Sequence, residues 1–237
     1  MSSHKALTGV HNYVEFKDET IASRVKKMVE IREGLDVSNL HVKFSYGNRK
    51  TGNLVPSASL IPVADCKSCE LCKNGCYAVR NIACYDASRK NLANNSAIAR
   101  KDPEKFFREV DGEMKKNCWF RFFVSGDILS GAFFDAMVEV SKRNPHCQVL
   151  AFTKQFRIVN QWIDYNGELP SNLHIIFSEW RGLDVPNPHS LPTSRPVWKG
   201  EHVPSGIWCG GDCSACAVKD DGCWALKPGE RVLFEAH

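Results

Sequence analysis

Hydrophobic and polar positions follow two different rhythms along the chain, and each rhythm predicts a type of element. Apolar residues three and four positions apart indicate amphipathic helices, whereas short, nearly continuous apolar runs indicate strands buried on both faces. The clearest run is CWFRFFVSGD, at residues 118–127. These patterns predict helices at 19–33, 86–101, 103–116, 130–145 and 157–167, strands at 40–47, 57–63, 118–127, 147–154 and 173–180, and a candidate edge strand at 231–236.

Several helix boundaries carry signals of their own. Asp86 and Asp102 are preferred N-cap residues, and Pro103 suits the first helical position because it has no N–H to leave unpaired. Gly34 and Gly167 stand where two of the helical patterns end, and glycine commonly ends helices.

Strands and helices alternate with short links between residues 118 and 180. This order predicts parallel strands joined by right-handed crossovers. We therefore expect one α/β domain with a parallel sheet. Its parts would be an arm, helix and strand at 1–50, a β/α core at 51–182, and a proline-rich loop with a cysteine-rich segment at 183–237.

Composition narrows the classes of function without choosing one. The net charge of +4 permits an anionic partner but does not require one. No apolar run is long enough to span a bilayer, and the first residues have no apolar core of a secretion signal. We expect a cytoplasmic protein with no membrane partner.

The cysteine content changes this picture, because eleven cysteines are unusual in a chain with no export signal. A reducing cytosol disfavours disulfides and favours metal ligands or redox groups. Cys84 is a spare ligand candidate, whereas Cys118 and Cys147 stand at strand starts and are expected to be buried free thiols. The other eight form two sets, Cys66, Cys69, Cys72 and Cys76, and Cys209, Cys213, Cys216 and Cys223.

The spacing of the first set is C-x2-C-x2-C-x3-C, the ligand run of bacterial ferredoxins, although Tyr77 stands where those proteins have proline. The second set is spaced C-x3-C-x2-C-x6-C. The spacing favours iron–sulfur chemistry, as one or two [4Fe–4S] clusters. Structural zinc is the alternative, since it also takes four thiolates. Thiolates from both sets meeting at one shared centre are a third option.

Polar residues follow the predicted strands at the edge where parallel α/β sheets bind ligands. Ser125, Gly126, Asp127 and Lys154 are candidate cofactor-binding residues, and Glu179 is expected at the same rim. Two simpler roles compete with this hypothesis. Asp127 would suit an N-cap of the next helix, and a lysine at a strand end is often only solvated.

Other side chains near these positions invite expectations of their own. Arg121 lies within an apolar strand and needs a partner, for which Asp127 or a bound anion would serve. Four aromatic residues beside the cysteines suit either a shield around a cluster or ordinary core. They are Tyr77, Tyr85, Trp208 and Trp224.

The segment FRFFVSGDILSGAFFDAMVEVSKRNPHCQVLAFTK, with CKNGCYA before it, resembles the gene product 88 family of phage and prophage proteins. The resemblance covers roughly residues 50–226 and implies a phage or mobile-element origin and a metal centre.

More distantly, the C-x3-C-x2-C run and the order of strands and loops resemble radical S-adenosylmethionine barrels, and this resemblance implies a partial (β/α) barrel-like parallel sheet. In those barrels a cluster loop follows the first strand, and a GGE-type motif binds the cofactor's amino group. Here Ser125, Gly126 and Asp127 occupy that place, and Thr153 and Lys154 end the next strand.

That likeness implies an iron–sulfur enzyme acting on a nucleobase, a nucleic acid or another phage-relevant substrate. The alternative is a non-catalytic module, stabilised by iron–sulfur or zinc, that binds nucleic acid or a host protein.

Overall fold

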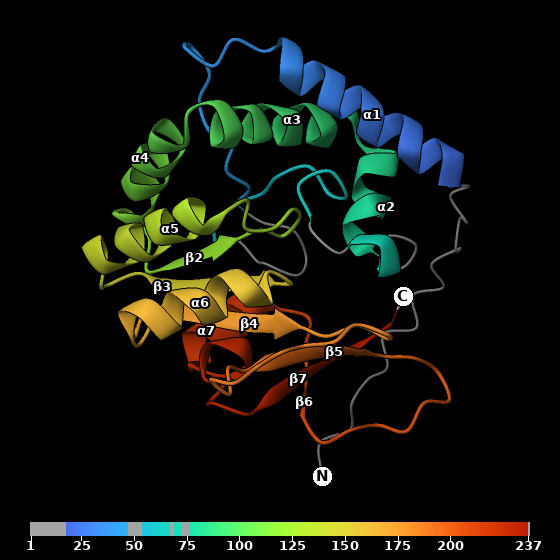
Figure 1. The fold of residues 1–237 in the computed structure, drawn as a ribbon, viewed down its shortest axis with the longest axis vertical. Coiled ribbons are helices and arrows are strands. Elements are labelled where there is room, and N and C mark those ends of the chain that lie inside the picture. Colours follow the sequence, from blue (N-terminus) through green and yellow to red (C-terminus); the bar gives the residue numbers. More distant parts are fainter. Residues whose placement is uncertain (1–17, 47–53, 67–68, 73–75, 237) are drawn as a thin grey trace.

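A computed structural model describes residues 18–46, 54–66, 69–72 and 76–236, so most of the expected N-terminal arm lies outside it (Figure 1). Among these residues seven strands form one sheet in the order β1-β2-β3-β4-β5-β7-β6, and every neighbouring pair is parallel. The strands are β1 (Ser57–Ala58), β2 (Trp119–Phe122), β3 (Gln148–Thr153), β4 (Leu173–Ser178), β5 (Thr193–Val197), β6 (Ile207–Trp208) and β7 (Arg231–Glu235).

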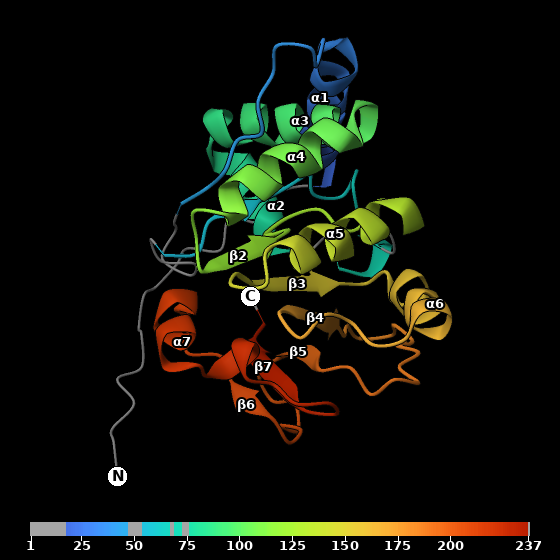
Figure 2. The ribbon, with the colours of Figure 1, turned by 90° about the vertical axis from the view of Figure 1, so that its left-hand side faces the viewer.

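Helices cover both faces of this sheet, with α4, α5 and α6 on one side and α7 on the other (Figure 2). The expected helices between residues 86 and 167 are confirmed with small shifts of their ends. The helices are α1 (Asp18–Gly34), α2 (Tyr77–Cys84), α3 (Asp86–Lys101), α4 (Pro103–Met114), α5 (Gly131–Arg143), α6 (Phe156–Asn166) and α7 (Cys213–Lys219), with 3-10 turns η1 (Cys69–Leu71) and η3 (Gly222–Trp224).

The main core lies between the sheet and α4, α5 and α6. On β2, Phe120 and Phe122 point into this core, whereas Trp119 and Arg121 are half-buried and lie toward α7. The side chains of β2 therefore alternate between buried and half-buried, and the strand is not fully buried on both faces as the sequence predicted. That alternation leaves one charged side chain, Arg121, on the face that carries the C-terminal segment.

The α7 side of the sheet has a smaller core of its own. Leu150 and Ile176 of the sheet pack against Ala217 of α7, Trp224 of η3 and Val55. This cluster fixes the C-terminal cysteine-rich segment over the middle strands, because burying its apolar residues there removes them from water.

A third apolar cluster joins Met28 of α1, Ile82 of α2 and Ala93 of α3 to Ile61. Ile61 lies between β1 and the first cysteine loop. The helices at the top of Figure 1 therefore anchor the start of that loop.

The expected strand at 40–47 is wrong for the residues described. Residues 40–46 pair with the sheet only through an isolated antiparallel bridge, Ser45 to Ser57. Helix side chains satisfy the backbone instead: Lys43 N–H donates to Asn95 and Lys43 C=O accepts from it, while Val42 N–H donates to Glu109. An alternating sequence therefore stays extended without entering the sheet.

Other sequence expectations need smaller corrections. The strand expected at 57–63 shrinks to two residues, and α3 has Tyr85 at its N-cap position rather than Asp86. Asp102 does cap α4, accepting from Lys105 N–H.

The C-terminal strands differ most from expectation. β7 is not an edge strand but lies between β5 and β6. β5 contains Pro196, which the sequence placed in a loop. β4 pairs with β5 only at Thr193 and Ser194, so Pro196 lies beyond that ladder, where its missing N–H is tolerated.

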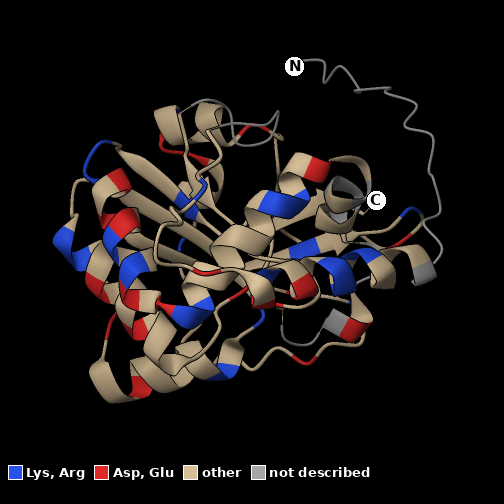
Figure 3. Ribbon diagram, turned by 90° about the horizontal axis from the view of Figure 1, so that it is seen from above, with Lys and Arg blue, Asp and Glu red and all other residues tan. Residues whose placement is uncertain are grey.

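Charges of both signs are interleaved over the described helices and loops (Figure 3). This distribution agrees with the mild net charge. None of the described helices is long and apolar enough to cross a bilayer.

Candidate metal centre

The first cysteine loop lies between β1 and α2. Cys72 is buried, and Cys66 and Cys76 are half-buried. Cys76 directly precedes α2, and burial raises the pKa of its thiol, with Cys72 and Cys66 adding to the effect. Three of the four predicted ligands are therefore neighbours. The side chain of the fourth, Cys69, lies outside the described residues.

Asp65 fixes the start of this loop, and the sequence argument missed it. Its buried carboxylate accepts from Arg32 Nη1 at 3.2 Å and from Arg100 Nε at 2.7 Å, so α1 and α3 both hold it. A second oxygen accepts from Ile61 N–H at 2.9 Å. The only signal in the sequence was an acid directly before Cys66.

The second cysteine set lies on the α7 side of the sheet, and all four of its members are half-buried. Cys209 follows β6, and its N–H donates to Leu233 C=O of β7 at 2.9 Å. Cys213 and Cys216 lie on α7, one turn apart, and Cys223 lies on η3. Asp212 caps α7 by accepting from the N–H groups of residues 214 and 215.

These four thiols are close enough to influence one another's charge. Burial, together with the nearby Cys209 and Cys213, raises the pKa of Cys223 to about 12. Burial also raises the pKa of Cys216, again with contributions from Cys209 and Cys213. Half-buried thiols that repel one another as thiolates form a site that a cation would stabilise.

Arg121 provides a positive charge beside this set. Its Nη1 donates to Cys213 Sγ at 3.6 Å, and its Cζ lies 5.0 Å from the ring centroid of Phe152. Burial raises the pKa of Cys213, and the guanidinium opposes that rise. The predicted partner Asp127 is wrong, because the observed partner is a cysteine on the C-terminal segment.

One of the four aromatic residues takes the expected position. Trp224 is buried, donates its indole N–H to Cys213 C=O at 3.2 Å, and packs edge-on against His174. Tyr85 and Trp208 are exposed, so neither is buried beside the cysteines. The side chain of Tyr77 lies outside the described residues.

The predicted cofactor-binding residues are brought together at the carboxyl ends of β1, β2 and β3. Ser125 Oγ donates to Leu60 C=O at 2.7 Å, and Leu60 N–H donates to Ser125 C=O at 2.9 Å. Gly126 has φ of +82°, and a Cβ there would lie 2.6 Å from Leu60 Cβ. Close packing against Leu60 therefore accounts for this glycine without a ligand.

Asp127 connects this loop to β3. Its carboxylate accepts from Thr153 Oγ1 at 2.6 Å and from Lys154 N–H at 3.0 Å. Burial raises the pKa of Asp127, while these hydrogen bonds oppose the rise. Ser130, not Asp127, caps α5. The observed contacts are structural, and a role for these residues in cofactor binding stays a prediction.

Two of the four described non-glycine residues with positive φ follow strands at this edge. Val63, after β1, has φ of +70°, and Phe123, after β2, has φ of +56°. β-branched and bulky side chains rarely adopt this left-handed region. Such conformations cluster at functional sites, where the surrounding structure holds them.

The remaining cysteines divide by burial. Cys147 is fully buried, as expected, and burial raises its pKa to about 12. Cys118, expected to be buried, is exposed. Cys84 is exposed at the end of α2.

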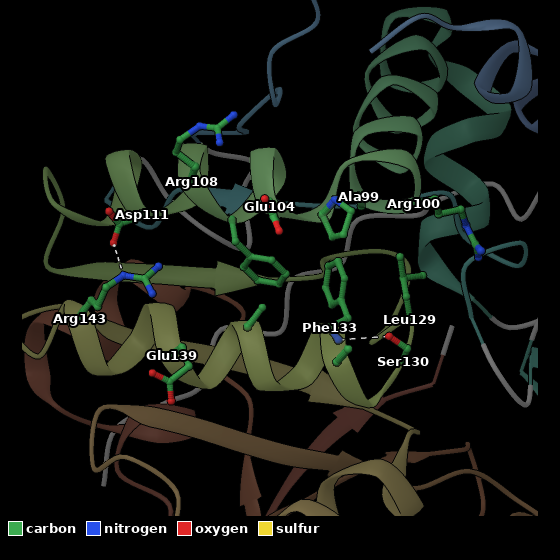
Figure 4. Close-up of a pocket in the computed structure, with 14 residues that line it drawn as sticks. Ala99, Arg100, Glu104, Arg108, Asp111, Leu129, Ser130, Phe133, Glu139 and Arg143 are labelled. Atoms are coloured by element: carbon green, nitrogen blue, oxygen red, sulfur yellow. Dashed lines mark hydrogen bonds and ion pairs between the residues drawn. The ribbon is translucent and has the colours of Figure 1, made fainter. Parts of the chain in front are cut away.

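A cavity of about 750 Å³ lies between α4 and α5 (Figure 4). Phe107, Phe133 and Leu129 contribute apolar walls, and an ion pair between Arg143 and Asp111 lies at one end. None of the predicted site residues lines it.

Among the described residues, no group of three or more His, Cys, Asp and Glu side chains is arranged to hold a metal ion. The candidate site contains two sets of thiols, which are soft metal ligands, and the two sets have different neighbours. Figures 1 and 2 both draw α2, which follows the first set, well apart from α7, which carries part of the second.

The model of a family described as Gene product 88 matches residues 42–184, more than half of the chain. The chain belongs to the gene product 88 family. The match includes the first cysteine loop, β1 to β4 and Arg121, whereas the second cysteine set of this gene product 88 protein follows it. No curated protein and no solved structure matches the chain.

Proposed function

We propose that this chain is an iron–sulfur-cluster protein of phage or mobile-element type, with a radical S-adenosylmethionine-like catalytic role. Cys209, Cys213, Cys216 and Cys223 would hold one [4Fe–4S] cluster, and the first loop would hold a second. The substrate would be a nucleobase, a nucleic acid or another phage-relevant molecule. The family supports the phage origin.

The observation that carries the proposal is the grouping of four half-buried thiols beside a guanidinium. Besides burial, Cys209 raises the pKa of the other three thiols, Cys213 raises those of Cys216 and Cys223, and Cys213 Sγ also accepts from Arg121 Nη1. Iron–sulfur clusters are held by such thiolates, and hydrogen bonds to their sulfurs tune the reduction potential. The thiol side chains would turn toward a common centre when the cluster binds.

A cluster held there would supply one-electron transfer. The chain's own residues would do the rest: Arg121 would donate to the Cys213 sulfur, and the Trp224 indole would exclude water on one side. The strained loops after β1 and β2 lie at the carboxyl edge, where parallel sheets bind small ligands.

A partial barrel is the arrangement that would suit this role. The segment after β6, an edge strand, returns over the sheet to contact Arg121 of β2, the second strand from the other edge. In such a barrel Ser125, Gly126, Asp127 and Lys154 would face a bound S-adenosylmethionine.

The proposal is tested by purifying the protein without oxygen and measuring iron, acid-labile sulfide and zinc. We expect a brown protein with about eight irons per chain if both sets bind, or about four for one centre. A colourless protein with zinc and no iron would contradict it. Reductive cleavage of S-adenosylmethionine after adding dithionite then tests the catalytic part.

A second candidate is a non-catalytic module in which the metal only stabilises the fold. The observation that favours it is the apolar cluster joining Trp224 and Ala217 to Leu150 and Ile176. A metal at the adjacent thiols would fasten this segment to the sheet, because binding energy at such sites becomes folding energy. Iron without S-adenosylmethionine cleavage, or zinc alone, is the result expected for this candidate.

A further inference from the structure

Four residues just beyond the ends of three neighbouring strands form a cluster of aromatic rings and cations, here called the rim cluster. Lys154 follows β3, Trp180 and Arg181 follow β4, and Trp198 follows β5. The two indole rings pack edge to face, with centroids 5.3 Å apart. Lys154 Nζ lies 5.9 Å from the Trp180 centroid, and Arg181 Cζ lies 4.3 Å from the Trp198 centroid.

The rim cluster continues the row of side chains on the α7 side of the sheet. Phe152 belongs to this row, because it packs with the α7-side cluster, and Lys154 is two positions further on. The strand register puts Ser178 and Pro196 on the same face of the sheet. Ser178 is two positions before Trp180, and Pro196 is two positions before Trp198. With side chains alternating along strands, the cluster lies at the carboxyl edge of the side that also carries Arg121.

Two partly buried carboxylates, Glu201 and Glu179, bind residues of the rim cluster and the arginines next to it. Glu201, with a side chain 14% exposed, accepts from Trp198 N–H at 3.1 Å, from Arg195 Nη2 at 2.6 Å, and pairs with Arg181 Nη2 at 3.4 Å. Glu179, with a side chain 15% exposed, accepts from Arg231 Nε at 2.8 Å.

The cations are more exposed than the carboxylates that they pair with. The side chains of Arg181, Arg195 and Arg231 are 56%, 34% and 30% exposed. These three arginines and Lys154 lie near two carboxylates, Glu179 and Glu201. The two carboxylates are more buried than the arginines. What this part of the edge presents to solvent is therefore positive charge beside indole rings.

We infer that the rim cluster is a binding site for a nucleotide unit, that is, a planar base attached to a phosphate. Bases of any sequence stack on aromatic side chains, and lysine and arginine bind the adjoining phosphate. Lys154 lies beside Trp180, and Arg181 lies beside Trp198. A base and its phosphate are similarly close within a nucleotide.

The exposed Arg181 makes the site adaptable. An exposed cation–π contact is weaker than base–aromatic stacking, so a base would displace Arg181 from the Trp198 ring. The freed guanidinium would then be available to the phosphate. Lys154, over Trp180, would meet the same phosphate or the next one in a strand.

The rim cluster uses none of the cysteines, and it shares only Lys154 with the proposed S-adenosylmethionine site. It therefore remains testable in protein that contains zinc, or no metal at all. A cysteine variant that loses its iron but still binds the nucleotide would separate failure of the metal proposal from failure of this one.

Isothermal titration calorimetry on the full chain tests the inference. The probes are a single-stranded oligothymidylate of about ten nucleotides, thymidine 5′-monophosphate, thymidine and inorganic phosphate. We expect binding of the first or the second that weakens with added salt. Lys154→Ala and Trp198→Leu should each weaken it about tenfold, as the loss of one phosphate contact or one stacked base implies. Trp198→Phe, which keeps an aromatic plane, should retain most of the affinity.

Two matched controls lie elsewhere on the molecule. Lys142→Ala removes an equivalent contact, 5.8 Å from the Trp162 ring, and Tyr165→Leu removes an exposed aromatic ring from α6. Neither should change the affinity. Much tighter binding of the oligonucleotide would identify the ligand as part of a strand, and equal binding of the mononucleotide would identify it as a free nucleotide.

Three results would overturn the inference. The first is no binding of either nucleotide probe. The second is inorganic phosphate binding as tightly as the nucleotide, which would mean that the base contributes nothing. The third is an affinity that falls equally in Lys142→Ala and Lys154→Ala.

Discussion

Single residues at the loop starts decide how the candidate site is held. Asp65 carries two arginine contacts from two helices, and its side chain is fully buried. Nothing in the apolar pattern identifies such a residue, because its partners are distant in sequence. Its position directly before Cys66 makes it the residue through which α1 and α3 position the first cysteine loop.

Replacing Asp65 with asparagine should destabilise the protein by about 3 kcal/mol, because it breaks a buried ion pair and leaves Arg32 near a neutral group. Urea unfolding measures this change. The matched control is Asp86→Asn, since Asp86 also meets two cations, Arg89 and Lys90, but is exposed. A loss in Asp86→Asn as large as that in Asp65→Asn would contradict the assignment.

Gly126 offers a second test at the same scale. Gly126→Ala adds a left-handed strain and a clash with Leu60, so we expect a loss of about 3 kcal/mol in the free energy of unfolding. The control is Gly229→Ala. Gly229 has nearly the same φ as Gly126, +81°, but no atom lies within 4 Å of the Cβ that alanine would add. This substitution should cost about 1 kcal/mol. Equal losses in thermal or urea unfolding would show that the contact with Leu60 does not matter.

At the scale of elements, the η3 turn is fastened to β4 by an aromatic contact. Trp224 of η3 packs against His174 of β4, whose Nε2 lies 2.8 Å from Gln148 Oε1 of β3. Burial lowers the pKa of His174, and the charge of Asp220 opposes this change only in part. The folded state therefore favours the neutral imidazole.

This contact predicts a dependence of stability on pH. Because the folded pKa lies below the unfolded value of about 6.5, the stability present above pH 6.5 is lost as the pH falls from that value through the folded pKa. Melting temperatures between about pH 7.5 and pH 5.5 should fall more in the wild type than in His174→Gln. Parallel curves for the two proteins would contradict the assignment.

Elements also differ in how far the sequence revealed them. β2, β3 and β4 were predictable because each is a compact apolar run that directly follows a helix with clear signals. β5 was missed because its sequence, TSRPV, has a proline and few apolar residues. α7 was missed because seven residues, CSACAVK, are too few to show a helical pattern of apolar positions.

The candidate site was predictable in part. The spacing of the second set of cysteines predicted that they lie near one another, because only a few residues separate each from the next. The partner of Arg121 was not predictable, because Cys213 reaches it from a segment that returns across the sheet. Likewise, the position of β7 between β5 and β6 depends on spatial order, which no local pattern carries.

At the scale of the whole molecule, the two cysteine sets occupy different regions. The first belongs to the helices around α2, and the second lies on the α7 side of the sheet. Figures 1 and 2 draw these regions apart. Two independent centres, rather than a shared one, are the arrangement that this separation favours.

Removing one set should therefore leave the other loaded. In the double variant Cys213→Ala and Cys223→Ala, we expect about half of the iron to remain, and the same for Cys72→Ala with Cys76→Ala. Iron and sulfide analysis of anaerobically purified variants measures this. Complete loss of iron in both variants, with the fold retained by circular dichroism, would support a shared centre instead.

The strand order has a consequence for how the molecule forms. β6 precedes β7 in the chain, yet among the described strands it pairs only with β7, and Cys209 is held by Leu233 of that strand. β6 cannot join the sheet until the later strand has inserted beside β5. Such non-local pairings form slowly. We therefore expect Cys209 to join the second cysteine set late in folding, so that its thiol stays open to oxidation or to the wrong metal until β7 is in place.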